Sequence, residues 1–184
     1  MEERIIVSEE RMPWLLERLC FLFLERHVHP EAVAVVALQP RGVAFGRAWM
    51  RTLERHIPGR LPDFGFLDIT FHRDDYRKRE ELGIPSETHM PFIVENRPVL
   101  LLDDVLYTGR SVRAGLDAIL SYGRPSSIEL MVLVERRFSR EMPIQPDYVG
   151  ERVDALSSEK VRVLWEPQPR VILYQTMDLK KPPL

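Results

Sequence analysis

Apolar residues recur along the chain with two different periods, which predict alternating helices and strands. From Glu9 to His27 the apolar positions fall three or four residues apart, as in an amphipathic helix with Ser8 as its N-cap. Residues 32–38 (AVAVVAL) form instead a short unbroken apolar run, typical of a strand covered on both faces. The same two patterns predict helices over 43–56 and 111–123, and strands over 64–72, 99–104, 127–135, 161–166 and 171–177.

This alternation predicts an α/β fold, with a mostly parallel central sheet flanked by helices on both faces. Residues 73–97 interrupt it, because they are dense in charge and follow no sustained period. Such a segment is typical of a long mobile loop. A chain of 184 residues that is 45% hydrophobic has apolar material for one full-sized core. We therefore expect a single domain over residues 1–184.

Composition and charge exclude several classes of protein. The formal net charge of −2 gives no global basic field, so contact with nucleic acid would need a local patch. The single cysteine, Cys20, rules out a disulfide framework or a Cys-ligated metal site within one chain. The N-terminus is too charged for a secretory signal, and no apolar stretch approaches the roughly 20 residues of a membrane span. These features predict a cytoplasmic protein without membrane contact.

The stretch LLLDDVLYTGRS, residues 100–111, carries the clearest chemistry. An apolar strand stops on Asp103 and Asp104, and a turn through Gly109 leads to the helix that begins near Ser111. The glycine lets the backbone approach an anion closely, at the positive end of a helix dipole. Two carboxylates would repel a phosphate, so they must serve hydroxyl groups or a divalent cation. A ribose that carries a phosphate satisfies both halves of the stretch.

The longer stretch VLLLDDVLYTGRSVRAGLDAI resembles the phosphoribosyl-pyrophosphate (PRPP) motif of the type I phosphoribosyltransferases. It has the form found in PyrR, the family of pyrimidine-operon attenuation regulators and uracil phosphoribosyltransferases. The resemblance continues in order through residues 67–75, 123–134, 142–151 and 158–166. It implies a type I phosphoribosyltransferase fold with a mobile flap and a small hood, a PRPP motif over 99–111, and a homodimer or higher homo-oligomer.

The resemblance also implies roles for individual residues. Asp103 and Asp104 would bind the ribose hydroxyls, and Arg73 would open the flap that closes over PRPP, which makes these three the implied catalytic residues. Because neighbouring strand residues point to opposite faces, we expect only one of the two carboxylates to touch ribose directly. Arg136 and Leu156 are the implied nucleobase-binding residues. The implied PRPP- and phosphate-binding residues are Val105, Leu106, Tyr107, Thr108, Gly109, Arg110, Ser111, Arg41 and Gly42.

Tyr107 bears on the choice of base. Purine-using relatives generally place an Asp here, whereas a phenol is a poor base at neutral pH, so a pyrimidine is favoured. The implied reaction converts uracil and PRPP to UMP and pyrophosphate. The implied cofactor is Mg²⁺, held mainly by oxygens of PRPP, with Asp103 or Asp104 as the protein's candidate ligand and no other metal-ligating residue.

Three departures from the family pattern leave two other functions open. Pro40 replaces the usual Thr before Arg41 and removes an amide donor and a hydroxyl. Residues 135–143 (ERRFSREMP) are one residue longer than the family loop and lack its glycine, and residues 154–158 (DALSS) replace a Pro-Thr-Ser stretch. One alternative is a PRPP- or nucleotide-binding protein whose catalysis has decayed. The other is a nucleotide-sensing regulator that binds messenger RNA.

The first predicted helix argues against the RNA-binding alternative. Where the family usually presents a Thr and a His, this chain has Glu17 and Phe21. A carboxylate repels phosphates, and a phenyl group neither carries charge nor donates a hydrogen bond to them. A local basic patch would have to come from Arg18, Arg26, Arg137, Arg140 and Arg152.

Overall fold

The computed structural model describes residues 3–72 and 87–175. Arg73 and most of the loop predicted over 73–97 lie outside these residues. The remainder of that loop is fixed at His89, which pairs with Phe66 through two backbone hydrogen bonds of 2.8 and 2.9 Å. His89 thus lies next to β3 (Asp63–Leu67).

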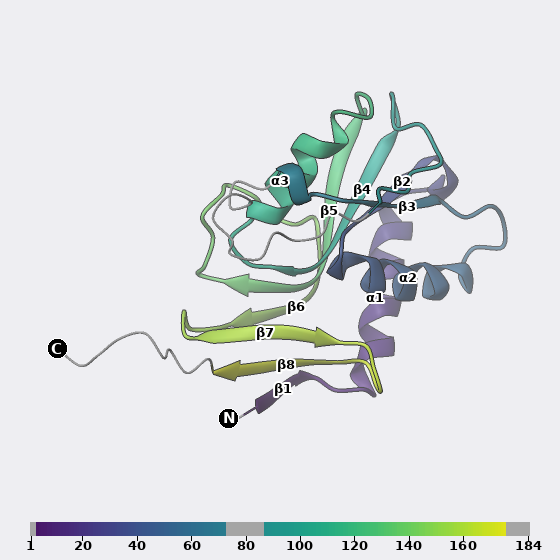
Figure 1. Cartoon of the computed structure of the whole chain (residues 1–184). Coiled ribbons are helices and arrows are strands. Elements are labelled where there is room, and N and C mark those ends of the chain that lie inside the picture. The colour runs from purple at the N-terminus through teal and green to yellow at the C-terminus, as the bar shows by residue number, and fades with distance from the viewer. Residues whose placement is uncertain (1–2, 73–86, 176–184) are drawn as a thin grey trace.

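A five-stranded sheet forms the centre of the molecule (Figure 1). Its order is β3-β2-β4-β5-β6 and every pairing is parallel, which confirms the predicted parallel sheet. Besides β3, its strands are β2 (Ala34–Leu38), β4 (Pro98–Leu106), β5 (Ser127–Arg137) and β6 (Tyr148–Asp154). β2 is wholly buried, in line with its unbroken apolar sequence.

Helices cover both faces of this sheet (Figure 1). α1 (Arg11–Arg26) and α2 (Arg41–Glu54) pack on one face, and α3 (Arg110–Ile119) packs on the other. The pleat of β2 divides its side chains between two apolar layers. Val35 and Ala37 join the layer under α1 and α2, whereas Val36 and Leu38 join the layer under α3. Short 3₁₀ turns, η1 (Pro30–Ala32) and η2 (Thr70–His72), complete the connections.

A second, antiparallel sheet has the order β1-β8-β7. Its strands are β1 (Glu3–Val7), β7 (Glu159–Leu164) and β8 (Arg170–Gln175), so segments from the two ends of the chain lie side by side (Figure 1). This sheet has the size and place of the expected small hood. It brings β7 to the carboxyl end of β4, where the predicted site lies.

Several predicted element boundaries were wrong. The strand predicted over 64–72 ends at Leu67, because the Asp68 carboxylate accepts the amide and the hydroxyl of Thr70, at 2.9 and 2.6 Å, and turns the chain into η2. The helix predicted over 111–123 ends at Ile119 in a tighter turn. At the start of α1, the backbone carbonyl of Ser8 accepts the amide of Met12, and no side chain caps the helix.

β1 and β6 were not predicted. β1 is short, with charged residues and exposed positions, and β6 mixes Gly150 with three charged residues. Gly150 is needed because a Cβ there would lie 2.4 Å from the carbonyl oxygen of Leu133 on β5. Among the described residues, no helix is long and apolar enough to cross a membrane.

Candidate active site at the carboxyl end of the central sheet

Asp103 and Asp104 lie buried at the end of the central strand β4. Each carboxylate turns back onto the chain: Asp103 Oδ1 accepts the amide of Asp104 at 2.9 Å, and Asp104 Oδ1 accepts the amide of Val105 at 2.8 Å. Both residues line one cavity of about 570 Å³ at the carboxyl end of β4. The expectation that only one of the two carboxylates touches ribose stays a prediction.

The cavity gathers most of the sequence-predicted site in one place. Arg41 comes from the start of α2 and Arg136 from the end of β5. Tyr107 comes from the turn after β4, and Ser111 comes from the first turn of α3. The remaining lining residues are Leu38, Gln39, Pro40, Ile69, Val105, Lys160, Val161, Arg162 and Tyr174. Segments far apart in the sequence thus meet at the carboxyl ends of the parallel strands, where ligands of such sheets bind.

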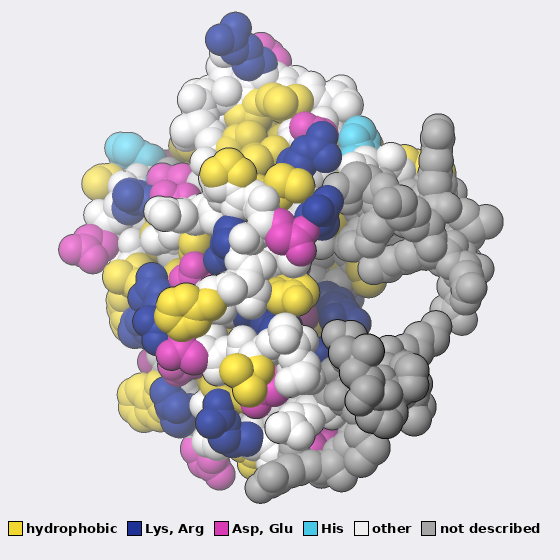
Figure 2. Space-filling model, turned by 90° about the vertical axis from the view of Figure 1, so that its left-hand side faces the viewer, with side chains coloured by type: hydrophobic (Ala, Val, Ile, Leu, Met, Phe, Trp, Pro, Cys, Tyr) yellow, Lys and Arg dark blue, Asp and Glu magenta, His cyan; other side chains and the backbone are white. Residues whose placement is uncertain are grey.

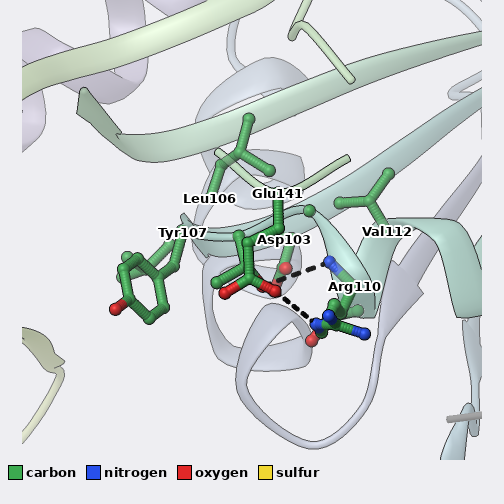
Figure 3. A pocket seen from close by; sticks show the side chains of 10 residues that line it. Asp103, Leu106, Tyr107, Arg110, Val112 and Glu141 are labelled. Atoms are coloured by element: carbon green, nitrogen blue, oxygen red, sulfur yellow. Dashed lines mark hydrogen bonds and ion pairs between the residues drawn. The ribbon is translucent and has the colours of Figure 1, made fainter. Parts of the chain in front are cut away.

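A second cavity of about 310 Å³ adjoins the first and shares Asp103 with it. Its wall is the turn predicted to hold the 5′-phosphate, at the N-terminus of α3. Gly109 has φ +89°, a left-handed conformation that favours glycine. Figure 3 shows Tyr107 and Arg110 at opposite ends of this cavity. The lining residues are Asp103, Val105, Leu106, Tyr107, Thr108, Gly109, Arg110, Ser111, Val112 and Glu141.

The loop after β5 forms hydrogen bonds and an ion pair with the turn at residues 107–110. The carbonyl oxygen of Thr108 accepts the amides of Glu141 and Met142 at 3.0 and 3.1 Å. Glu141 also forms an ion pair with Nε of Arg110 at 2.6 Å (Figure 3). Arg140 donates to the carbonyl oxygen of Tyr107. Sequence reasoning missed Glu141, because nothing in its local pattern shows that it reaches a turn some 30 residues away.

Gly42 is the place where α2 presses against β4. A Cβ at this position would lie 2.7 Å from the carbonyl oxygen of Leu102 and 3.4 Å from Cα of Asp103. Both contacts are with backbone, which cannot rotate away as a side chain could. The glycine therefore lets the first turn of α2, and with it Arg41, sit directly beside the aspartate pair.

Burial and mutual repulsion control the charge of the aspartate pair. Burial raises the pKa of Asp103, and the nearby negative charge of Asp104 raises it further. Burial also raises the pKa of Asp104, while the positive charge of Arg41 opposes this shift. The pair thus holds a proton more readily than exposed carboxylates do. A ligand that donates hydroxyl hydrogen bonds or brings positive charge would favour the ionised pair.

Arg136 closes the opposite side of the cavity. Its guanidinium carbon lies 4.0 Å from the ring centroid of Tyr107, and its Nη2 donates to the carbonyl oxygen of Leu156 at 3.2 Å. Its buried Nε has no hydrogen-bond partner within the described part of the chain. Burial lowers the pKa of Arg136. The Leu156 side chain itself is 65% exposed and does not line the cavity, so only its backbone supports the site.

The hood supplies site residues that sequence reasoning missed. Lys160 and Arg162 line the cavity from β7, and Tyr174 lines it from β8 with its ring 5.5 Å from the Arg162 guanidinium. The alternating sequence KVRV was a usable signal, because residues two apart on a strand share one face. It did not reveal which face meets the central sheet.

Similarity to known proteins agrees with this arrangement. A family model of the phosphoribosyl transferase domain matches residues 21–164. The bifunctional protein PyrR of Desulfosudis oleivorans is 39% identical over 165 residues, which are 89% of this chain and 91% of that protein. The chain belongs to the PyrR family. The family relationship confirms the resemblance that residues 99–119 carry.

Other relatives support the same assignment. The bifunctional protein PyrR of Bacillus subtilis is 37% identical over 164 residues, which are 88% of this chain and 90% of that protein. A crystal structure of hypoxanthine phosphoribosyltransferase from Staphylococcus aureus superposes with a TM-score of 0.65 at 19% identity, covering 91% of this chain and 90% of that one. This second likeness shows the phosphoribosyltransferase fold and no more.

The chain departs from its family's loop pattern around Phe138. This residue has φ +62°, a conformation that L side chains rarely adopt, and its ring is exposed. Arg137 stacks on the ring at 5.4 Å and is itself held by Asp154 through two hydrogen bonds of 2.6 and 2.7 Å. Phe138 therefore adds an exposed aromatic ring to the loop that follows β5.

Proposed function

We propose that this protein transfers the phosphoribosyl group of PRPP to uracil, giving UMP and pyrophosphate. One observation carries the proposal. The aspartate pair lies between a turn shaped for a phosphate and a pocket wall formed by Tyr107 and Arg136. A ribose 5-phosphate whose phosphate binds at this turn would have its hydroxyl groups at Asp103 and Asp104. Its anomeric carbon would then face Tyr107.

The chain's own groups act by position and charge. The ring nitrogen of uracil forms a bond to the anomeric carbon of ribose as the bond from that carbon to pyrophosphate breaks. The proton of that nitrogen passes to the departing pyrophosphate or to water. Arg41 lies beside the carboxylates of Asp103 and Asp104, where its charge would stabilise the departing pyrophosphate. The described residues thus favour a mechanism of positioning and electrostatics.

Asp103 and Asp104 fit a Mg²⁺ ion that is shared with PRPP. Mg²⁺ is commonly held by one or two carboxylates together with substrate phosphates, and these two line one cavity. When bound, the ion neutralises charge on the leaving pyrophosphate. We also propose, from the family relationship, that the protein is cytoplasmic and assembles as a homodimer or a larger homo-oligomer.

Tyr107 supports a pyrimidine acceptor. Its phenol replaces the acidic group of purine-using relatives, and its ring is occupied by the Arg136 guanidinium. Uracil needs no strong base on the enzyme, because a ring N–H of modest acidity is deprotonated as the bond to ribose forms. Uracil is accordingly proposed as the preferred base over the purines hypoxanthine and guanine, and the family resemblance favours it over orotate.

A second candidate function is PRPP or nucleotide binding without turnover. It is favoured by Glu141, whose carboxylate already pairs with Arg110 in the phosphate cavity, and by Arg136, which already donates to Leu156. Product analysis decides between the two functions. The protein is incubated with PRPP, Mg²⁺ and each labelled nucleobase in turn, and PRPP binding is measured by calorimetry. UMP from uracil alone supports the enzyme, whereas PRPP binding without product from any base supports the second candidate.

A further inference from the structure

Two positively charged side chains of the hood, Lys160 and Arg162, line the larger cavity from β7. They are two residues apart on one strand, so they share a face and their Cα atoms are separated by about 6.6 Å. Within residues 3–72 and 87–175 neither side chain donates a hydrogen bond or pairs with a carboxylate, and Arg162 packs only on the ring of Tyr174. Two cations without carboxylate partners in a cavity wall favour an anionic ligand.

The packing of β7 shows on which side of the central sheet these cations lie. The alternate residues of the strand, Val161 and Val163, pack into the apolar layer that α1 and α2 cover. Arg41 begins α2 on the same side of the sheet and lines the same cavity. Lys160, Arg162 and Arg41 therefore bring three positive charges to the α2 side of the cavity.

PRPP carries an anionic group at each end of its ribose, a 5′-phosphate and a diphosphate on the anomeric carbon. The turn proposed to bind the 5′-phosphate leads into α3, which packs on the opposite face of the central sheet. Asp103 and Asp104, proposed to bind the ribose hydroxyls, lie near the end of β4 between the two faces. A ribose bound in this way has its diphosphate on the α2 side, where the three cations lie.

The start of α2 alone offers few groups to a diphosphate. Pro40, the N-cap of this helix, has no amide hydrogen and no side-chain donor. The positive charge of Arg41 already faces the negative charges of Asp103 and Asp104. A diphosphate bound at this end of the cavity therefore needs further cations, and the hood presents two.

We propose that Lys160 and Arg162 bind the diphosphate of PRPP, and the pyrophosphate released from it, against the first turn of α2. This role rests on the proposed function, because it takes PRPP as the substrate. Their spacing lets each cation contact one phosphoryl group, and the Tyr174 ring, 5.5 Å from the Arg162 guanidinium, orients that side chain. The hood thus stabilises the negative charge of the leaving group, while Tyr107 and Arg136 face the base.

Calorimetry with inorganic pyrophosphate and Mg²⁺ tests the two cations directly. Arg162→Met is expected to raise the dissociation constant about tenfold, as is Lys160→Met, because each removes one hydrogen bond between charged groups. Arg162→Lys keeps the charge and should stay within about threefold of wild type. The matched control is Arg170→Met, because Arg170 lies on the same face of the hood, opposite Leu164, and does not line the cavity. It should change the constant less than about twofold.

Ribose 5-phosphate is the second probe. Its dissociation constant should change less than about twofold in Arg162→Met and Lys160→Met, because the turn that binds its phosphate is untouched. Pyrophosphate affinity that ignores both variants overturns the proposal. An equal loss for both probes also overturns it, since the variants would then disturb the whole site. Circular dichroism of each variant verifies that it is folded.

Pyrophosphate binding needs no turnover, so its measurement separates this subsite from the proposed function. Binding that depends on Arg162, in a protein that makes UMP from no base, supports the subsite and contradicts the proposed function. UMP formation together with pyrophosphate binding that ignores both hood cations supports the function and overturns the subsite. In the active enzyme, Arg162→Met should raise KM for PRPP about tenfold and leave KM for uracil within about twofold. A rise in KM for uracil alone would assign these cations to the base and overturn the proposal.

Discussion

The guanidinium of Arg136 stacks on the ring of Tyr107 with 4.0 Å between the guanidinium carbon and the ring centroid. The two residues come from the ends of neighbouring parallel strands, β4 and β5. Arg136 is only 4% exposed, so this contact replaces much of the hydration that the cation loses. The pair forms a preorganised wall of the larger cavity, at the place where the nucleobase is proposed to bind.

Arg136→Lys tests this wall. Lysine keeps the positive charge but loses the planar stack and the fork of donors, so KM for the nucleobase is expected to rise about tenfold, corresponding to roughly 1–2 kcal/mol. The dissociation constant for PRPP should stay within about twofold, because the phosphate turn is untouched. Steady-state kinetics with uracil and calorimetry with PRPP measure the two quantities. Arg113→Lys, on the exposed side of α3, is the control. If Arg136→Lys weakened PRPP binding as much as it raised KM for the nucleobase, the assignment of Arg136 to the nucleobase would be wrong.

Asp104→Asn is expected to weaken binding of PRPP with Mg²⁺ by about 1–3 kcal/mol, the usual range for a hydrogen bond to a charged group. Asparagine keeps the shape of the side chain and can still accept the amide of Val105, so the local fold is preserved. Calorimetry compares it with Asp117→Asn on α3, where the carboxylate is exposed and paired with Arg113. Equal PRPP affinity in wild type and Asp104→Asn would remove the ribose-binding role.

The raised pKa of Asp103 predicts how stability depends on pH. Because the folded state holds this proton more tightly than the unfolded state, the contribution of Asp103 to stability is fully present below its ordinary pKa of 3.8. It is lost as pH rises through the folded value. At neutral pH the ionised Asp103 therefore costs stability. Asp103→Asn is expected to raise the free energy of unfolding at pH 8 by about 1 kcal/mol or more.

Urea unfolding at pH 8 and at pH 5 checks this prediction. The advantage of Asp103→Asn over wild type should shrink at the lower pH, since a larger share of wild-type molecules then carries the proton. Asp117→Asn, which removes an exposed carboxylate paired with Arg113 on α3, serves as the control for the loss of one negative charge. A variant that is less stable than wild type at pH 8 would show that the Asp103 carboxylate is stabilised by partners in the folded protein.

The sequence predicted the centre of the fold better than its edges. Runs such as 32–38 and 99–104 are apolar on both faces, so their burial in a parallel sheet follows from composition alone. β1 and β6 lie at sheet edges, where one side of the strand needs no apolar residue and the pattern therefore fades. The turn at Asp68 shows a further limit, because a side-chain hydrogen bond to Thr70 overrides the apolar residues that follow.

The candidate site was predictable where it is local in sequence. Residues 103–111 carry their carboxylates, glycine and hydroxyls within one turn, and the structure assembles them around two adjoining cavities. Lys160, Arg162 and Glu141 reach the same cavities from elements whose approach depends on tertiary packing. Each aspartate carboxylate also accepts the amide of the following residue, a contact that the residue types alone did not predict.

We expect that this protein does not bind RNA in the manner implied by the family resemblance. Four of the five arginines that could form a basic patch give the reason. Arg137 is paired with Asp154, Arg140 and Arg152 share Glu135, and Arg26 lies near Glu129 and Asp147. Figure 2 shows one face of the molecule, on which side chains of both signs are interspersed with apolar ones among the described residues. These arginines would have to leave carboxylates before they could contact phosphates, which dominate affinity for RNA.

An electrophoretic shift with the leader RNA of this organism's own pyrimidine genes tests that expectation. At physiological salt we expect weak, sequence-blind binding that UMP does not strengthen. Sub-micromolar, UMP-stimulated and sequence-specific binding would instead establish the regulatory alternative. Asp154→Asn provides an internal check, because it releases Arg137 for one more phosphate contact. It should tighten the residual binding at low salt and steepen its dependence on the logarithm of salt by about 0.7, the increment for one contact with a single strand.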